Sequence, residues 1–248
     1  MQSFTDRGDG VHLAYHLTPG RSPILVFLPG FMSDVTGDKA TALAAMAQNA
    51  GFACLRLDYS GHGASQGAFT AGTIGRWRDD ALHIIDTHTT GPIVLVGSSM
   101  GGWIALLVAL HRPGRIAALI GIAAAPDFTK TLWAGLSAKA HSAIMHDGEW
   151  RVPSPYGGEQ VFTRALFDDG AKHLLLDGAI AINAPTHLLQ GMHDDAVPWQ
   201  TALTIAERLS STQVRVTLIK DGDHRLSRPA DLALLCQIAG DFLRADGG

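Results

Sequence analysis

Short apolar runs alternate with amphipathic stretches along almost the whole chain. The alternating pattern at 11–15 predicts a half-buried strand, and the continuous apolar run at 23–28 predicts a strand buried on both faces. Further apolar runs predict strands at 52–57, 93–96, 116–122, 186–190 and 214–219. Apolar residues at helical spacing predict helices at about 39–49, 74–84, 102–107 and 202–209, and a last helix with Pro229 near its first turn. Strands that alternate with helices in this way are typical of a mostly parallel sheet covered by helices on both faces.

This alternation breaks between about residues 126 and 183. The interval contains short amphipathic pieces followed by prolines and glycines, which predicts an inserted lid of small helices. No linker, repeat or low-complexity segment divides the sequence, and 248 residues are enough for one domain with a sizeable core. We therefore expect a single α/β domain over residues 1–248, with a lid inserted at about 126–183.

A glycine-rich turn joins the predicted strand at 93–96 to the helix at 102–107. Its sequence, Gly97-Ser98-Ser99-Met100-Gly101, has the G-x-S-x-G pattern of a nucleophile elbow. Glycines let the strand and the helix approach closely, and the strained central residue projects its side chain above the sheet. The pattern alone is common, but a preceding strand and a following helix are the context that it requires. Ser99 is therefore the predicted nucleophile.

A serine hydroxyl becomes a good nucleophile when a histidine accepts its proton and a carboxylate orients that histidine. In folds with this elbow the chain order is serine, acid, histidine, and the site lies at the carboxyl ends of the strands. His224 follows the last predicted strand, and Asp194 and Asp195 follow the strand before it. We therefore expect His224 and one of these aspartates to converge on Ser99.

The choice between the two aspartates depends on their spacing from neighbouring residues. A common pattern for the acid is glycine, two residues, aspartate, two residues and valine-proline. That pattern selects Asp194, between Gly191 and Val197-Pro198. Asp195 is expected to hydrogen-bond its own turn instead.

Two backbone amides are expected to bind the oxyanion that forms when the serine attacks a carbonyl. One is the amide of Met100, at the start of the helix after the elbow, where the helix dipole also favours negative charge. The other is the amide of Phe31, in the loop after the strand at 23–28. Such chemistry requires no cofactor.

Other histidines have structural interpretations. His62 lies in a Gly-His-Gly loop after a different strand and is interpreted as a turn residue. His193 adjoins Asp194 and Asp195, but three consecutive loop residues rarely converge on one ion. We therefore predict no metal site.

The predicted lid contains three aromatic residues that are candidate substrate-binding residues, namely Trp133, Trp150 and Tyr156. Two interpretations of them stay open. They either line a pocket for an acyl group or pack within the lid alone.

Composition argues against several classes of function. Hydrophobic residues make up 46% of the chain and charged residues 17%, which is typical of a globular protein. A net charge of −4 argues against a nucleic-acid-binding surface. No apolar run is long enough for a membrane span, and the first residues lack the pattern of a secretion signal, so we expect a cytoplasmic location. Cys54 and Cys236 are expected to be free, buried thiols in a reducing compartment.

Six motifs are distributed along the chain. They are Asp58-Tyr59-Ser60-Gly61, Trp77-Arg78-Asp79-Asp80, Gly97-Ser98-Ser99-Met100-Gly101-Gly102-Trp103, Ala118-Leu119-Ile120-Gly121, Gly191-Met192-His193-Asp194-Asp195-Ala196-Val197-Pro198-Trp199 and Asp223-His224-Arg225. These motifs resemble those of the α/β-hydrolase superfamily and, more closely, those of the mitochondrial palmitoyl-protein thioesterases. That family also hydrolyses acyl glucuronides and includes the mycophenolic acid acyl-glucuronide esterases. The resemblance covers nearly the whole chain and is weakest in the lid.

The resemblance implies an α/β-hydrolase fold, and the family's catalytic triad carries over onto Ser99, Asp194 and His224. It also implies a small-molecule or acylated substrate. The lid usually selects the acyl group, and the lid departs most from the family pattern here. The expected function is therefore hydrolysis of carboxylic esters or thioesters in general, rather than depalmitoylation in particular. The sequence has no arginine-rich presequence and in this respect resembles a bacterial-type cytosolic relative.

Other functions on the same scaffold stay open. A ligand-binding protein could keep the three residues without turnover, and a serine hydrolase could act on peptide or carbon–carbon bonds with the same groups. A dehalogenase or an epoxide hydrolase needs an aspartate at the elbow, where this chain has Ser99. The oligomeric state is left open by the sequence.

Overall fold

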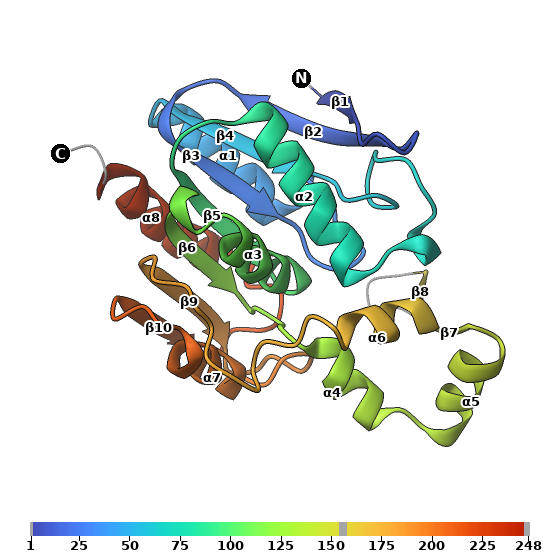
Figure 1. Cartoon of the computed structure of the whole chain (residues 1–248). Coiled ribbons are helices and arrows are strands. Elements are labelled where there is room, and N and C mark those ends of the chain that lie inside the picture. Colours follow the sequence, from blue (N-terminus) through green and yellow to red (C-terminus); the bar gives the residue numbers. More distant parts are fainter. Residues whose placement is uncertain (1, 154–157, 246–248) are drawn as a thin grey trace.

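The computed structural model describes residues 2–153 and 158–245. In these ranges, eight strands form one sheet in the order β1-β2-β4-β3-β5-β6-β9-β10 (Figure 1). The strands from β4 to β10 in this order run parallel, whereas β1 and β2 pair antiparallel at one edge. Their bounds are β1 Gln2–Asp6, β2 His12–Thr18, β3 Arg21–Leu28, β4 Phe52–Leu57, β5 Ile93–Ser98, β6 Ile116–Ile122, β9 Thr186–Gly191 and β10 Val214–Ile219.

Helices cover both faces of the sheet. The helices are α1 Asp38–Asn49, α2 Ile74–His88, α3 Met100–His111, α4 Phe128–Gly135, α5 Ala138–His146, α6 Arg164–Gly170, α7 Gln200–Arg208 and α8 Pro229–Ala245. In Figure 1, α2, α3 and α7 lie in front of the sheet, and α1 and α8 lie behind it. Each layer has its own apolar core, because the strands are buried on both faces and place side chains alternately into each.

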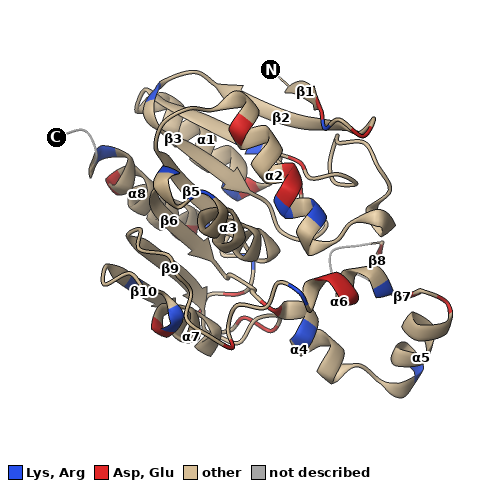
Figure 2. Cartoon of the chain, in the orientation of Figure 1, with Lys and Arg blue, Asp and Glu red and all other residues tan. Residues whose placement is uncertain are grey.

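The central strand β5 and the helix α3 that follows it are the most deeply enclosed elements. All six residues of β5 and the ten residues 100–109 of α3 are buried. Neither element contains a charged residue, whereas both signs of charge are distributed over the outer helices and loops (Figure 2). The elbow therefore joins two apolar, deeply enclosed elements of the core.

The segment between β6 and β9 lies beyond one end of the sheet (Figure 1). It contains α4, α5 and α6, as expected of a lid of small helices, and also an antiparallel hairpin of β7 Glu149–Pro153 and β8 Glu159–Thr163. The prediction of helices alone was incomplete. Trp150 and Phe162 lie opposite each other across the hairpin and pack together, an arrangement that the short amphipathic pieces of this segment did not indicate.

The predicted strands and core helices are confirmed, and the fold is the expected mostly parallel sheet between helices. The sequence pattern missed β1, which is a short edge strand whose residues alternate between exposed and partly buried. Cys54 lies buried in β4 and Cys236 half-buried in α8, and both are free thiols. None of the helices in the described ranges is long and apolar enough to cross a membrane.

Candidate active site

Ser99 lies in the sharp turn between β5 and α3. Its φ is 54° and its ψ is −120°, a backbone conformation that non-glycine residues rarely adopt. Its backbone amide donates to the carbonyl of Ile122 at 2.9 Å, which ties the turn to the neighbouring strand β6. A Cβ at Gly97 would lie 2.2 Å from the Gly101 carbonyl oxygen, and one at Gly101 would lie 2.2 Å from the Leu28 carbonyl oxygen. Glycine is therefore required on both sides of the serine.

The three side chains predicted from separate strand ends lie in hydrogen-bond contact. The Nε2 atom of His224 lies 3.1 Å from the Oγ atom of Ser99. The Nδ1 atom of His224 lies 2.8 Å from the Oδ2 atom of Asp194. A histidine in this position can accept the serine proton while the carboxylate holds its tautomer.

Four donors surround the fully buried carboxylate of Asp194. Its Oδ1 atom accepts from the amides of Ala196 and Val197 at 2.9 and 2.8 Å, and its Oδ2 atom accepts from His224 and Gln190. Burial would raise the pKa of Asp194, but the hydrogen bonds from His224 and the turn amides hold it below its usual value. The carboxylate therefore stays ionised next to the histidine.

The prediction for the second aspartate of this turn was wrong. We expected Asp195 to hydrogen-bond its own turn, but the turn amides donate to Asp194 instead. The Asp195 side chain is exposed, and among the described residues it has no hydrogen-bond partner. Asp194 therefore both caps the turn and contacts the histidine.

Gln190 is a site residue that the sequence analysis missed. It is fully buried at the end of β9, and its Nε2 atom donates to Asp194 at 2.8 Å. A polar residue inside an apolar strand, directly before the loop of the acid, was the available signal. The amide of His193 donates to the carbonyl of Gly222 at 2.9 Å, so the loops of the acid and the histidine are joined directly.

The two amides predicted to bind an oxyanion are both available. Met100 is the first residue of α3, and Phe31 lies in the loop after β3. Neither amide donates a hydrogen bond to another described residue. The Phe31 ring stacks on Phe162 of the lid hairpin at 5.4 Å between ring centroids and makes an edge contact with Phe128 of α4 at 5.9 Å. The lid therefore packs directly on the residue that carries one of these amides.

Two cavities open beside Ser99. One has a volume of about 690 Å³ and a largely apolar lining. Its lid and loop residues include Phe128, Leu132, Phe162, Val197 and Pro198. The other cavity has a volume of about 600 Å³, and polar groups are prominent in its lining. These include Ser33, Asp34, Asp38, Lys39 and Arg225.

Comparison with known proteins agrees with this geometry. A protein-family model described as serine aminopeptidase, S33 matches residues 21–164. The mitochondrial palmitoyl-protein thioesterase ABHD10 of Homo sapiens is 41% identical over 243 residues, which are 97% of this chain and 79% of that protein. The chain belongs to the α/β-hydrolase family.

Solved structures resemble this α/β hydrolase over nearly its whole length. ABHD10 from mouse is 40% identical, with a TM-score of 0.91 and coverage of 97% of both chains. Est1E from Butyrivibrio proteoclasticus, solved with ferulic acid bound, is 20% identical, with a TM-score of 0.81 and coverage of 97% of both chains. The similarity to Est1E concerns the fold alone.

The two candidate substrate-binding tryptophans of the lid, Trp133 and Trp150, lie apart from both cavities. Trp133 stacks on His141 at 4.5 Å and contacts Phe167, whereas Trp150 stacks on Phe162. Neither tryptophan is among the residues that line the two cavities. Tyr156 lies outside the described residues.

The two other histidines considered in the sequence analysis, His62 and His193, differ in their positions relative to the cavities. His193 lies in the lining of the apolar cavity, and His62 is buried behind the loop of Phe31 and lines neither cavity. The described ranges contain no group of three or more histidine, cysteine, aspartate or glutamate side chains that could hold a metal ion.

Proposed function

We propose that this α/β hydrolase cleaves carboxylic ester or thioester bonds of acyl substrates through a Ser99 acyl-enzyme. The observation that carries the proposal is the continuous hydrogen-bond chain from Ser99 through His224 to Asp194, of which Ser99 and His224 line both cavities. The similarity to a palmitoyl-protein thioesterase over nearly the whole chain supports the same bond type.

The reaction follows from the positions of these groups. Ser99 Oγ attacks the acyl carbonyl carbon while His224 Nε2 takes its proton, and the amides of Phe31 and Met100 stabilise the oxyanion. The bond to the leaving oxygen or sulfur then breaks, and that atom receives the proton from His224. A water molecule attacks the acyl-enzyme in the same way, so the carboxylic acid leaves and Ser99 regains its hydrogen.

The cavities support a division of the substrate between them. The apolar cavity, lined by Phe128, Leu132 and Phe162, suits an acyl chain because its burial there removes apolar surface from water. The polar cavity then receives the alcohol or thiol half. Phe31 and Ser99 line both cavities, so a substrate whose scissile bond lies at the serine can place one half in each cavity.

Replacement of the nucleophile tests the proposal. Ser99→Ala should abolish turnover of a p-nitrophenyl ester and labelling by a fluorophosphonate, with an unchanged circular dichroism spectrum. Ser210→Ala, remote from both cavities, is the control and should keep full activity. Turnover retained by Ser99→Ala would refute Ser99 as the nucleophile. A wild-type protein that neither labels nor turns over would instead support the ligand-binding alternative.

An acyl glucuronide is a second candidate substrate, favoured by the cationic groups of the polar cavity. Lys39 lines it together with Asp34 and Asp38, whereas Arg225 lines both cavities and pairs with Asp38 at 3.9 Å. Burial, together with the nearby Arg225, lowers the pKa of Lys39 to about 8. Lys39 therefore remains largely protonated near neutral pH and can attract the carboxylate of a sugar acid. Paired glucuronyl and glucosyl esters of one acid test this, and equal kcat/KM values for the pair would refute it.

A panel of substrates compared by kcat/KM tests which type of bond the protein cleaves. A panel of esters, thioesters and an aminoacyl anilide with graded acyl chains should show the highest kcat/KM for esters or thioesters. The anilide is included because the matching family model is described as a serine aminopeptidase.

The cytoplasmic location expected from the sequence stays a prediction, and the ABHD10 relative is described as mitochondrial.

A further inference from the structure

The loop that carries Phe31 is held along its length by the segment of residues 58–62. The Tyr59 hydroxyl donates to the carbonyl of Pro29 at 3.2 Å, before Phe31 in the loop. The Asp58 Oδ1 atom accepts from the amide of Val35 at 3.0 Å, near the end of the loop. Both side chains are buried, so water does not compete for these contacts. The segment therefore anchors the loop on both sides of the oxyanion amide.

The contact closest to Phe31 is made by His62. The amide of Met32, the next residue after Phe31, donates to the Nε2 atom of His62 at 3.2 Å. Met32 has a φ of 57°, in the left-handed region that non-glycine residues seldom adopt. A strained residue keeps such a conformation only where its surroundings hold it, and this hydrogen bond is one such restraint.

The protonation state of His62 is set by its surroundings. Its Nδ1 atom lies 3.3 Å from the carbonyl oxygen of Ser60, and because a carbonyl only accepts, the hydrogen is on Nδ1. Nε2 is then free to accept from Met32. Burial lowers the pKa of His62 to about 4, so this neutral form persists at neutral pH. The ring also packs against Trp77 and Phe69, at 5.0 and 5.1 Å between centroids.

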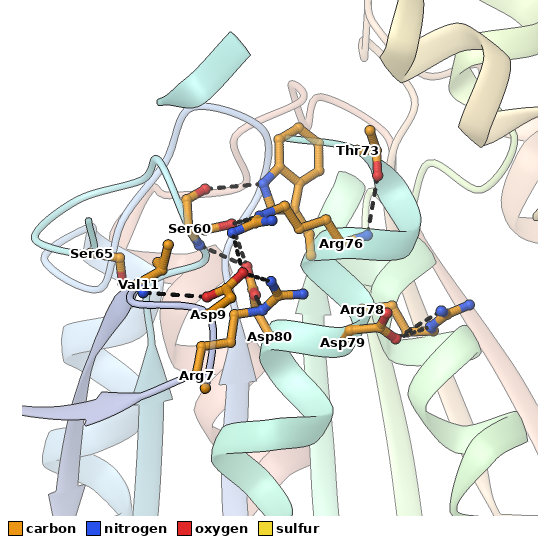
Figure 3. Close-up of polar contacts among 12 residues, drawn as sticks. Arg7, Asp9, Val11, Ser60, Ser65, Thr73, Arg76, Arg78, Asp79 and Asp80 are labelled. Atoms are coloured by element: carbon orange, nitrogen blue, oxygen red, sulfur yellow. Dashed lines mark hydrogen bonds and ion pairs between the residues drawn. The ribbon is translucent and has the colours of Figure 1, made fainter. Parts of the chain in front are cut away.

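Ser60, the partner of His62, is itself fixed by a buried polar network, which Figure 3 shows around Asp80. Asp80 Oδ2 accepts from the Ser60 amide at 2.8 Å and from its hydroxyl at 2.6 Å. Arg7 forms an ion pair with Asp80, and the Arg76 Nε atom donates to the Ser60 hydroxyl at 3.0 Å. Trp77 Nε1 donates to the same Ser60 carbonyl that His62 contacts. The network therefore defines where the His62 ring lies.

This network accounts for two sequence motifs that the proposed reaction does not use. Asp58-Tyr59-Ser60-Gly61 supplies the anchors of the oxyanion loop, and Trp77-Arg78-Asp79-Asp80 supplies the groups that hold Ser60. Arg78 and Asp79 pair with each other instead and lie apart from Ser60 in Figure 3.

We propose that His62 is a positioning residue for the oxyanion hole, which holds the Phe31 amide in place by accepting the hydrogen bond of Met32. The inference rests on the proposed function, because it takes the Phe31 amide as an oxyanion donor. His62 does not line either cavity, so it acts through Met32 and does not touch the substrate. The role deepens the turn interpretation of this histidine.

Three substitutions of His62 distinguish the role of its hydrogen-bond acceptor from the role of its aromatic ring. His62→Phe keeps an aromatic ring but leaves the Met32 amide without an acceptor. His62→Asn has a polar group only at the level of Nδ1, whereas the Oε1 atom of His62→Gln reaches the level of Nε2. His88→Phe is the matched control, since the His88 ring also packs against an aromatic ring, that of Tyr15. His88 is the last residue of α2, whereas His62 packs against Trp77 near the start of that helix.

The measurements are kcat and KM for a p-nitrophenyl ester, corrected for the fraction of active sites that a fluorophosphonate titrates, and the Ki of an acyl trifluoromethyl ketone. The ketone forms a tetrahedral adduct whose oxyanion needs the same two amides. We expect His62→Phe and His62→Asn to lower kcat about 10- to 100-fold with little change in KM, and to weaken ketone binding by a similar factor. His62→Gln should stay within about threefold of wild type, and His88→Phe should be unchanged.

A purely structural role predicts a different result. It would lower the titrated fraction of active sites and the melting temperature, but leave kcat per active site and ketone binding unchanged. That outcome, or failure of His62→Gln to recover activity, would overturn the inference alone. If His62→Phe fails to fold, His62→Asn against His62→Gln gives the same comparison. A wild-type protein that neither turns over the ester nor labels with a fluorophosphonate would refute the proposed function and the inference together.

Discussion

Replacement of Asp194 by asparagine tests the proposed triad through a single pair of atoms. The amides of Ala196 and Val197 can only donate, so they keep the one oxygen of the new amide at the Oδ1 position. Its NH2 group must then face Nδ1 of His224. His224 can meet a donor there only in the tautomer with its hydrogen on Nε2, and that nitrogen can no longer accept the proton of Ser99.

The size of the effect follows from the loss of the base. In the general Ser-His-Asp mechanism the same replacement lowers kcat about 10⁴-fold, which corresponds to about 5 kcal/mol of transition-state stabilisation. The fold should survive, because the amides of Ala196 and Val197 keep their acceptor, and Gln190 Nε2 keeps its donations to the carbonyls of Gly191 and Val197 at 3.3 Å when it loses its contact with residue 194. We therefore expect Asp194→Asn to lose about 10³- to 10⁴-fold in kcat, with a nearly unchanged melting temperature.

The assay is the steady-state hydrolysis of a p-nitrophenyl ester, with folding checked by thermal unfolding. Asp195→Asn is the comparison, because its exposed side chain makes no hydrogen bond among the described residues, and it should lose far less activity. If Asp194→Asn kept more than about a tenth of wild-type kcat, the tautomer reasoning would be wrong. If Asp195→Asn were the more damaging change, the acid would be Asp195.

Three further predictions concern the acyl cavity, stability and thiol reactivity. Leu132→Trp, which narrows the apolar cavity, should lower kcat/KM for a dodecanoyl ester at least about tenfold relative to a butyryl ester. Trp133→Leu, outside the cavity lining, should leave this ratio unchanged. If the ratio were the same in both variants, the acyl group would bind outside this cavity. The pKa of His62 is lowered from 6.5 to about 4 by burial, so the folded state binds fewer protons between these values and stability falls as pH drops through this window. His16, His88, His173 and His187 also have lowered pKa values, so urea unfolding should show a loss in both proteins that is larger in wild type than in His62→Gln by up to about 3 kcal/mol, and equal losses would contradict this. Burial raises the pKa of the Cys54 thiol to about 11, so iodoacetamide should alkylate the half-buried Cys236 first, and mass spectrometry that found Cys54 modified first would contradict this.

The core of the fold was predictable because its signals are local. Each strand and helix of the sheet layers buries a regular pattern of side chains, and the periods of these patterns differ between strands and helices. The lid hairpin was not predictable in this way. Its stability depends on Phe162 packing against Trp150 within the hairpin and against Phe31 far away in the sequence, and no local pattern encodes the second contact.

The candidate site divides along the same line. The convergence of Ser99, Asp194 and His224 followed from their positions at the carboxyl ends of parallel strands, because topology alone brings those ends together. The positions of Gln190 and His62 depend on hydrogen bonds across the fold, to Asp194 and to Met32. A sequence shows that such residues are polar, but not which distant donor or acceptor each of them meets.

Gln160, on the strand β8 of the lid hairpin, lines both cavities beside Ser99. A single displacement of this strand would thus reshape the two compartments at once. Under the proposed division of the substrate, mutation of the hairpin should therefore change the preference for the acyl group and the preference for the leaving group together. Libraries aimed at altering one preference alone are better built on α4, whose Phe128 and Leu132 face only one compartment.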